Sequence, residues 1–157
     1  MNMKFRPYQL LFVLSLVLLI ATMVMPAINI IEPNGATAIM DNFAYKAADG
    51  TISRAVVALG VVLIMTAVVN LFALFVSMFS NFALQKRSAI LSMLLLAGYY
   101  ILLLIYLLLL TTDAAVVMLP AMFMPLLALV SDAVAFTLVR KQEAKIIAKA
   151  LGFRLRD

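Results

Sequence analysis

Asp132 is the residue that most invites a chemical role, because it is the one formal charge inside four long apolar runs. A charged side chain at the centre of a membrane-spanning helix costs about 2.5–3.5 kcal/mol on insertion scales. Such residues usually face a protein interior and have partners there. An acid in this position can relay a proton or a cation. It can also hold helices together through hydrogen bonds while keeping its proton, because desolvation disfavours the charged form.

The partners of Asp132 can be sought by depth, at about 1.5 Å of rise per residue along a helix. Counted from the expected ends of the spans, Asp132 lies about 12 Å deep, Ser15 about 13 Å, Asn70 about 15 Å and Tyr99 about 16 Å. We therefore predict one intramembrane polar cluster of Ser15, Asn70, Tyr99 and Asp132. A structural clamp is favoured over a relay, because the outer half of the fourth span offers methionines and prolines and no polar path.

Four apolar runs, at about residues 8–28, 55–79, 88–110 and 114–139, would position this cluster. A helix needs about 20 apolar residues to cross a bilayer. The chain of 157 residues is 67% hydrophobic and 12% charged, about half the ~25% charged residues of a soluble domain. The sequence therefore predicts an all-α protein in which residues 1–157 form a single membrane domain, an antiparallel four-helix bundle.

Small and polar residues recur along one stripe of each span. The stripes are Tyr8, Ser15 and Thr22; Thr66, Asn70, Ala73 and Ser77; Ser88, Ser92, Tyr99 and Tyr106; and Ala121, Pro125, Ala128, Asp132 and Ala135. A period near 3.5 residues suits left-handed helix packing, and small residues let helices approach closely in lipid. We expect these stripes to be the buried faces, and we expect Pro125 to kink the fourth helix.

The connections between the spans differ in length. The external loop of residues 29–54 has turn signals at Pro33-Asn34-Gly35 and Ala48-Asp49-Gly50. Between these two turns, the sequence is compatible with a small β-hairpin or a short amphipathic segment. It is equally compatible with an irregular cap over the bundle. The second external loop, around residues 111–113, is very short, so the third and fourth spans should be antiparallel neighbours.

The basic residues indicate the orientation of the chain. Two precede the first span, two lie between the second and third, and six follow the fourth, so ten of the 12 lie on one side. The positive-inside rule then places both termini in the cytoplasm. We expect the first span to be retained rather than cleaved, because its apolar stretch is longer than that of a usual signal peptide.

The tail of residues 140–157 should extend the fourth helix into the cytoplasm and end near Gly152. Its charges either hold the helix end in the cytoplasm or contact anionic lipids or a partner. The residues predicted for such contacts are Arg87, Arg140, Lys141, Lys145, Lys149, Arg154 and Arg156. Nucleic-acid binding is not expected, because the basic residues follow membrane topology rather than a groove.

Absent residue types exclude several classes of enzyme. The chain has no Cys and no His, which excludes disulfide exchange, iron–sulfur ligation and ordinary haem ligation. Methionines gather near the external end, at Met23, Met25, Met118, Met122 and Met124, and flexible apolar packing explains them better than copper binding. With no visible nucleophile–base pair or metal-ligand set, we predict no catalytic residues, no metal and no cofactor.

Three short motifs resemble one family. They are Lys4-Phe5-Arg6 with Gln9-Leu10-Leu11 before a span that ends at Met25-Pro26; Asn81, Leu84-Gln85 and Arg87 in the cytoplasmic loop; and Arg140-Lys141-Gln142-Glu143 with Arg154-Leu155-Arg156 in the tail. Together they resemble a family of four-span inner-membrane proteins of the Bacteroidota, a domain of unknown function. The resemblance implies a topology and no activity.

The sequence thus favours a non-enzymatic accessory or assembly subunit of a bacterial envelope complex. Its tail, the Asn81–Arg87 loop and the external loop would provide the contacts. The alternative is a small proton-coupled transporter or channel module that works through Asp132. The expected partners are the lipid bilayer, anionic lipids at the tail, and either another membrane protein or further copies of this chain.

Overall fold

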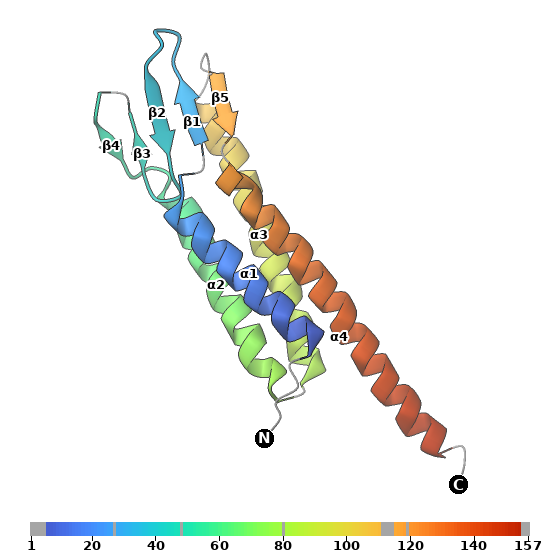
Figure 1. The fold of residues 1–157 in the computed structure, drawn as a ribbon. Helices are drawn as coiled ribbons and strands as arrows, with labels where there is room; N and C mark the ends of the chain where they lie inside the picture. Colours follow the sequence, from blue (N-terminus) through green and yellow to red (C-terminus); the bar gives the residue numbers. More distant parts are fainter. Residues whose placement is uncertain are drawn as a thin grey trace.

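Four long helices form the body of the molecule: α1 (Pro7–Val24), α2 (Val57–Ser77), α3 (Phe82–Leu110) and α4 (Met124–Arg154). The computed structural model describes residues 6–26, 28–47, 49–79, 81–110, 115–118 and 120–154, with the backbone alone for residues 110, 115–118, 153 and 154. By length and composition, four helices of the described chain could cross a membrane. Consecutive helices run in opposite directions, so α1 begins and α4 ends at the same end of the bundle (Figure 1). The predicted helical bundle is therefore present.

The polar stripes predicted from the sequence are the buried faces of the bundle. Ser15 and Thr66, for example, are fully buried. On the outer faces, Val68 of α2 and Leu94 of α3 are 60% and 64% exposed. α1 packs on α2 and α4, and α3 packs on the same two helices, which closes a four-membered ring. A protein with polar residues inside and large apolar residues outside suits a lipid environment.

A five-stranded sheet covers one end of the bundle, which we call the sheet end (Figure 1). Its strands are β1 (Ile28–Ile31), β2 (Thr37–Met40), β3 (Tyr45–Lys46), β4 (Ile52–Ser53) and β5 (Ala115–Met118), in the order β4-β3-β2-β1-β5. Every neighbouring pair is antiparallel. The connection between α1 and α2 is therefore a chain of hairpins rather than an irregular cap, and the connection between α3 and α4 adds a strand to it.

Two of the predicted turn signals make the sheet possible. Gly35 lies in the turn between β1 and β2 at φ 83°, and Gly50 lies in the turn between β3 and β4 at φ 89°. Glycine adopts these left-handed conformations without steric cost. At the first turn, Asn34 Oδ1 accepts a hydrogen bond from the Ala36 N–H at 3.0 Å, and at the second, Asp49 Oδ1 accepts one from the Thr51 N–H at 3.0 Å. The Thr51 hydroxyl also donates to Asp49 Oδ1, and together with the Thr51 N–H it lowers the pKa of the Asp49 carboxyl below its usual value.

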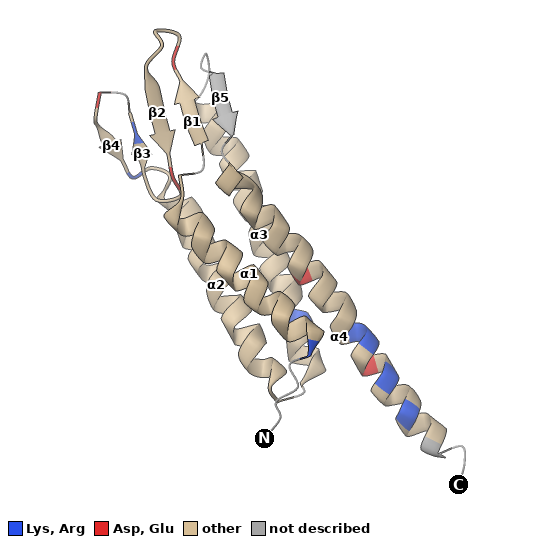
Figure 2. Cartoon of the chain, in the orientation of Figure 1, with Lys and Arg blue, Asp and Glu red and all other residues tan. Residues whose placement is uncertain are grey.

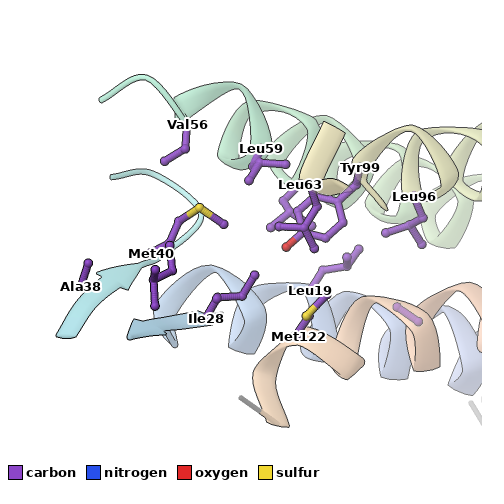
Figure 3. Packing of buried hydrophobic residues seen from close by; sticks show 13 residues of the cluster. Leu19, Ile28, Ala38, Met40, Val56, Leu59, Leu63, Leu96, Tyr99 and Met122 are labelled. Carbon is purple, nitrogen blue, oxygen red and sulfur yellow. The ribbon is translucent and has the colours of Figure 1, made fainter. Parts of the chain in front are cut away.

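The sheet packs onto the bundle through an apolar cluster. Ile28 of β1 and Met40 of β2 point toward Leu19 of α1 and Leu59 of α2 (Figure 3). All four side chains are fully buried. The approach is closest at Gly60, where an added Cβ would lie 2.3 Å from the Phe43 ring and 2.8 Å from the Asn42 carbonyl oxygen. The sheet is thus a packed part of the fold.

Several helix boundaries differ from the sequence prediction. The fourth helix begins at Met124, after a 3₁₀ turn at Pro120–Phe123, and residues 115–118 of the predicted span 114–139 are β5. Pro125 therefore lies in the first turn of α4, where its missing N–H would be unpaired in any case, and the predicted kink has no cause. The fourth helix also continues through Gly152 to Arg154, so the predicted cap at Gly152 is wrong.

The third helix starts earlier than the predicted span 88–110. Asn81 Oδ1 accepts a hydrogen bond from the Leu84 N–H at 3.2 Å, which suits the first residue of a helix. α3 then begins at Phe82, so most of the predicted Asn81–Arg87 loop is helical. Lys4, Arg156 and the predicted short loop around residues 111–113 lie outside the described part of the chain.

Candidate functional site

A polar network joins three helices around Asp132 of α4, which is fully buried. The Ser92 hydroxyl of α3 donates a 2.5 Å hydrogen bond to Asp132 Oδ2. The Asn70 amide of α2 donates a 2.9 Å hydrogen bond to Ser92 Oγ and a 3.2 Å bond to the Thr66 carbonyl oxygen. Ser92 therefore connects the amide of Asn70 to the acid.

Ser15 of α1 lies at the same depth in the bundle as this network. Its hydroxyl donates a 3.4 Å hydrogen bond to the carbonyl oxygen of Ala128, one helical turn before Asp132. Ser15 and Asn70 both adjoin the Asp132 carboxyl. Three of the four predicted cluster residues, Ser15, Asn70 and Asp132, are thus brought together, and all four helices contribute to the network.

Two acceptor atoms of this network have no hydrogen-bond donor among the described residues. Among the described residues, Asp132 Oδ1 and Asn70 Oδ1 are buried and have no hydrogen-bond partner. An unpaired buried acceptor costs about 1–3 kcal/mol. An ionised carboxylate is an acceptor only, whereas a protonated carboxyl also has one O–H donor. Chemically, the site can therefore hold a proton on Asp132 as part of its own bonding.

Tyr99 does not belong to the Asp132 cluster, and this part of the prediction is wrong. Its hydroxyl donates a 2.5 Å hydrogen bond to Asn42 Oδ1 at the sheet end. The depth of Tyr99 was counted from Ser88, but α3 begins at Phe82, so Tyr99 lies further toward the sheet. Ser92, two turns earlier on the same predicted stripe, takes its place beside the acid.

Asn42 is a buried polar residue that the sequence prediction missed. It follows β2 and is fully buried. Its Oδ1 accepts the hydrogen bond from the Tyr99 hydroxyl, and its Nδ2 donates a 2.8 Å hydrogen bond to the Thr22 carbonyl oxygen. The preceding residue, Asp41, fixes the turn, since its Oδ1 accepts from the N–H groups of Phe43 and Ala44 at 2.8 and 2.6 Å. An Asp-Asn pair after an apolar strand is the signal that could have indicated this turn.

Of the predicted contact residues, Arg87 lies near the start of α3, and those of α4 lie along the part of this helix that continues beyond the other helices, opposite the sheet (Figure 2). Arg87, Arg140, Lys141, Lys145 and Lys149 are described and are exposed. The Arg140 guanidinium lies 5.9 Å from the centre of the Phe136 ring. Of Arg154 only the backbone is described, and Arg156 lies outside the described residues.

One ion pair ties the start of α3 to α4 at this opposite end. Lys86 Nζ lies 2.5 Å from Glu143 Oε2, with the two side chains 28% and 30% exposed. A pair at this exposure contributes about 0–1 kcal/mol. A second polar link, from Gln9 Nε2 to Ser77 Oγ at 3.1 Å, joins α1 to α2.

Over the described residues, no group of three or more Asp and Glu side chains gathers to hold a metal ion. Asp132, Ser92 and Asn70 are all at most 1% exposed. The network at Asp132 is therefore enclosed by the helices that form it.

The chain matches the model of a known family. This model, described as "Domain of unknown function (DUF4293)", covers residues 8–150. This range includes nearly all of the four helices, the sheet and the Asp132 network. Among curated proteins, none matches the chain.

Proposed function

The chain belongs to the family described as domain of unknown function DUF4293, and on that premise we propose that it is a non-enzymatic accessory or assembly subunit of a bacterial envelope complex. It is a multi-pass protein of the inner membrane with both termini in the cytoplasm. The common end of α1 and α4 supports this orientation (Figure 1), together with the basic residues gathered there (Figure 2). The sheet end then faces the periplasm.

The proposal rests on the C-terminal part of α4, which does not pack on the other helices. This part of α4 continues beyond the other helices (Figure 1). In the last turns of this helix, Ile146, Ile147 and Leu151 are 45%, 53% and 54% exposed. A helix that carries an apolar strip usually buries it against another element. Within the described chain, no element packs on this strip, so a partner is needed.

The position of the strip favours a protein partner over lipid. The headgroup region on each side of the hydrocarbon core is only about 5–8 Å thick. Leu151 lies 11 residues beyond Arg140, which is about 16 Å along the helix axis. A straight α4 therefore carries this residue past the headgroups and into the cytoplasm, where an apolar strip binds another helix or groove.

Site-specific photo-crosslinking in cells tests the proposal. A photoreactive amino acid at Ile147 should give one discrete crosslinked protein of defined mass. The same group at Leu94, which faces outward in the middle of α3, is the control and should give no such product. If Ile147 and Leu94 give the same diffuse pattern, the strip has no specific partner and the proposal is wrong.

The Asp132 network has a structural role in this proposal. A proton on Asp132 would give this buried carboxyl a donor as well as an acceptor, and Ser92 would complete a clamp between α2, α3 and α4. Full enclosure of the acid supports the clamp, since a transport path would need access from both faces.

The second candidate function is a proton-coupled transporter or channel module. The unpaired Asp132 Oδ1 favours it, because a buried acceptor without a donor is a place where a transferred proton can reside. Proton uptake by reconstituted vesicles tests this candidate. Uptake that is present with the native chain and lost in Asp132→Asn, with the fold unchanged, would establish the relay and contradict the clamp.

A further inference from the structure

A recess of about 210 Å³ lies between the start of α1 and the part of α4 that leaves the bundle. Three cationic side chains line it. They are Arg6, which directly precedes α1, and Lys141 and Lys145 on consecutive turns of α4. The remaining lining residues are Pro7, Tyr8, Leu138 and Gln142. The recess therefore combines three positive charges, two polar side chains and an apolar wall.

No acid among the described residues lines this recess. Glu143 is the one acid of α4 beyond Asp132, and it turns toward α3 to pair with Lys86. Lys141 and Lys145 are four residues apart on one face of the helix, a spacing at which like charges repel. Gathering them with Arg6 around one space is unfavourable unless an anion occupies it.

The recess also presents oriented donors. Arg6 Nη1 donates a 2.7 Å hydrogen bond to the hydroxyl oxygen of Tyr8, which holds the guanidinium at the recess. Tyr8 is 2% exposed, and its own hydroxyl hydrogen has no acceptor in the part of the chain that the structure describes. α1 begins at Pro7, so the positive end of its helix dipole adds to the charge there.

We propose that this recess binds the phosphate group of an anionic lipid in the adjoining leaflet. Arg6, Lys141 and Lys145 would neutralise the phosphate, Tyr8 would donate a hydrogen bond to one of its oxygens, and Leu138 would contact the start of the acyl region. Lys141 and Lys145 lie about 2 and 8 Å beyond Arg140 along the helix axis, which is the depth of the headgroups. The proposal is independent of the accessory function.

The proposal is tested with the full chain purified in detergent and incubated with phosphatidylglycerol, phosphatidylcholine or inorganic phosphate. Native mass spectrometry measures the fraction of protein that retains each ligand. We expect phosphatidylglycerol to be retained at a lower concentration than phosphatidylcholine. Each cation removed by Lys141→Ala or Lys145→Ala should weaken this binding roughly 5-fold.

Lys149→Ala is the matched control, because it removes the same charge one turn beyond the recess and should leave the affinity unchanged. Tyr8→Phe removes a donor without changing the charge and should also weaken binding. Equal losses with Lys141→Ala and Lys149→Ala would mean general attraction to the tail and would overturn the site. Retention of inorganic phosphate without the lipid would overturn the proposed ligand.

Discussion

The Tyr99 hydroxyl donates a 2.5 Å hydrogen bond to Asn42 Oδ1, and this bond joins the middle of α3 to the turn that follows β2. Asn42 in turn donates to the Thr22 carbonyl oxygen near the end of α1. Two helices and the sheet therefore meet at one buried amide. The sheet end is held by polar bonds as well as by the apolar cluster around Met40.

Tyr99→Phe should destabilise the protein by about 1–3 kcal/mol, because Asn42 Oδ1 is left buried without a donor. The free energy of unfolding can be measured by titration with a denaturing detergent and circular dichroism. Tyr106→Phe, two turns along the same helix at a half-buried position, is the control and should change it little. Equal effects of the two substitutions would contradict the role of the Asn42 bond.

Gly60→Ala should also destabilise the fold, by about 1–3 kcal/mol, because the added methyl group overlaps Phe43 and the backbone of Asn42. Gly98→Ala provides a matched control, since an added Cβ there meets no atom within 4 Å. The same unfolding titration compares the two variants. A Gly60→Ala protein as stable as the Gly98→Ala protein would show that the sheet does not pack closely on α2.

Asp132→Asn should change stability by less than about 1 kcal/mol if the native acid is neutral, because the amide of Asn also offers one acceptor and a donor. Asp132→Ala should cost about 2–4 kcal/mol, since it removes these bonds and leaves a cavity. Unfolding of both variants under the same conditions measures the difference. A cost for Asp132→Asn as large as that for Asp132→Ala would indicate that the native charge itself is required.

The orientation can be tested with single cysteines, because the native chain contains none. Ser53 in β4 and Ala148 in α4 are both exposed and lie at opposite ends of the molecule. A membrane-impermeant maleimide should label Ser53→Cys in intact spheroplasts and should label Ala148→Cys only after lysis. The reverse pattern would place the termini outside.

The polar side chains that sequence depth located correctly share one property. Ser15 and Asn70 were counted from helix ends close to those that the structure has, Pro7 and Ser77, so a constant rise per residue was enough. Tyr99 failed because the charged Lys86 and Arg87 were taken to end the span, whereas α3 includes both residues. The depth of a residue counted along a helix is therefore only as accurate as the helix end from which it is counted.

The sheet could be predicted only in part, for a different reason. The turns at Gly35 and Gly50 are local signals that the sequence contains. β5, however, lies in an apolar segment that continues into α4, and such a run does not distinguish a strand from a helix by periodicity. Its pairing with β1 joins residues distant in sequence, as in the register Ile30 with Val116. No short-range pattern encodes that contact.

The pairing of β1 with β5 also joins the two halves of the bundle. It links the α1–α2 hairpin to the α3–α4 hairpin at the sheet end. In the middle of the bundle, the Ser15 bond to Ala128 and the Asn70 bond to Ser92 link the same two hairpins. At the other end, the described polar links, Gln9 with Ser77 and Lys86 with Glu143, each stay within one hairpin. A phosphate bound in the recess of Arg6 and Lys141 would add a link between α1 and α4 at that end, so lipid composition would affect how firmly the two hairpins are held together.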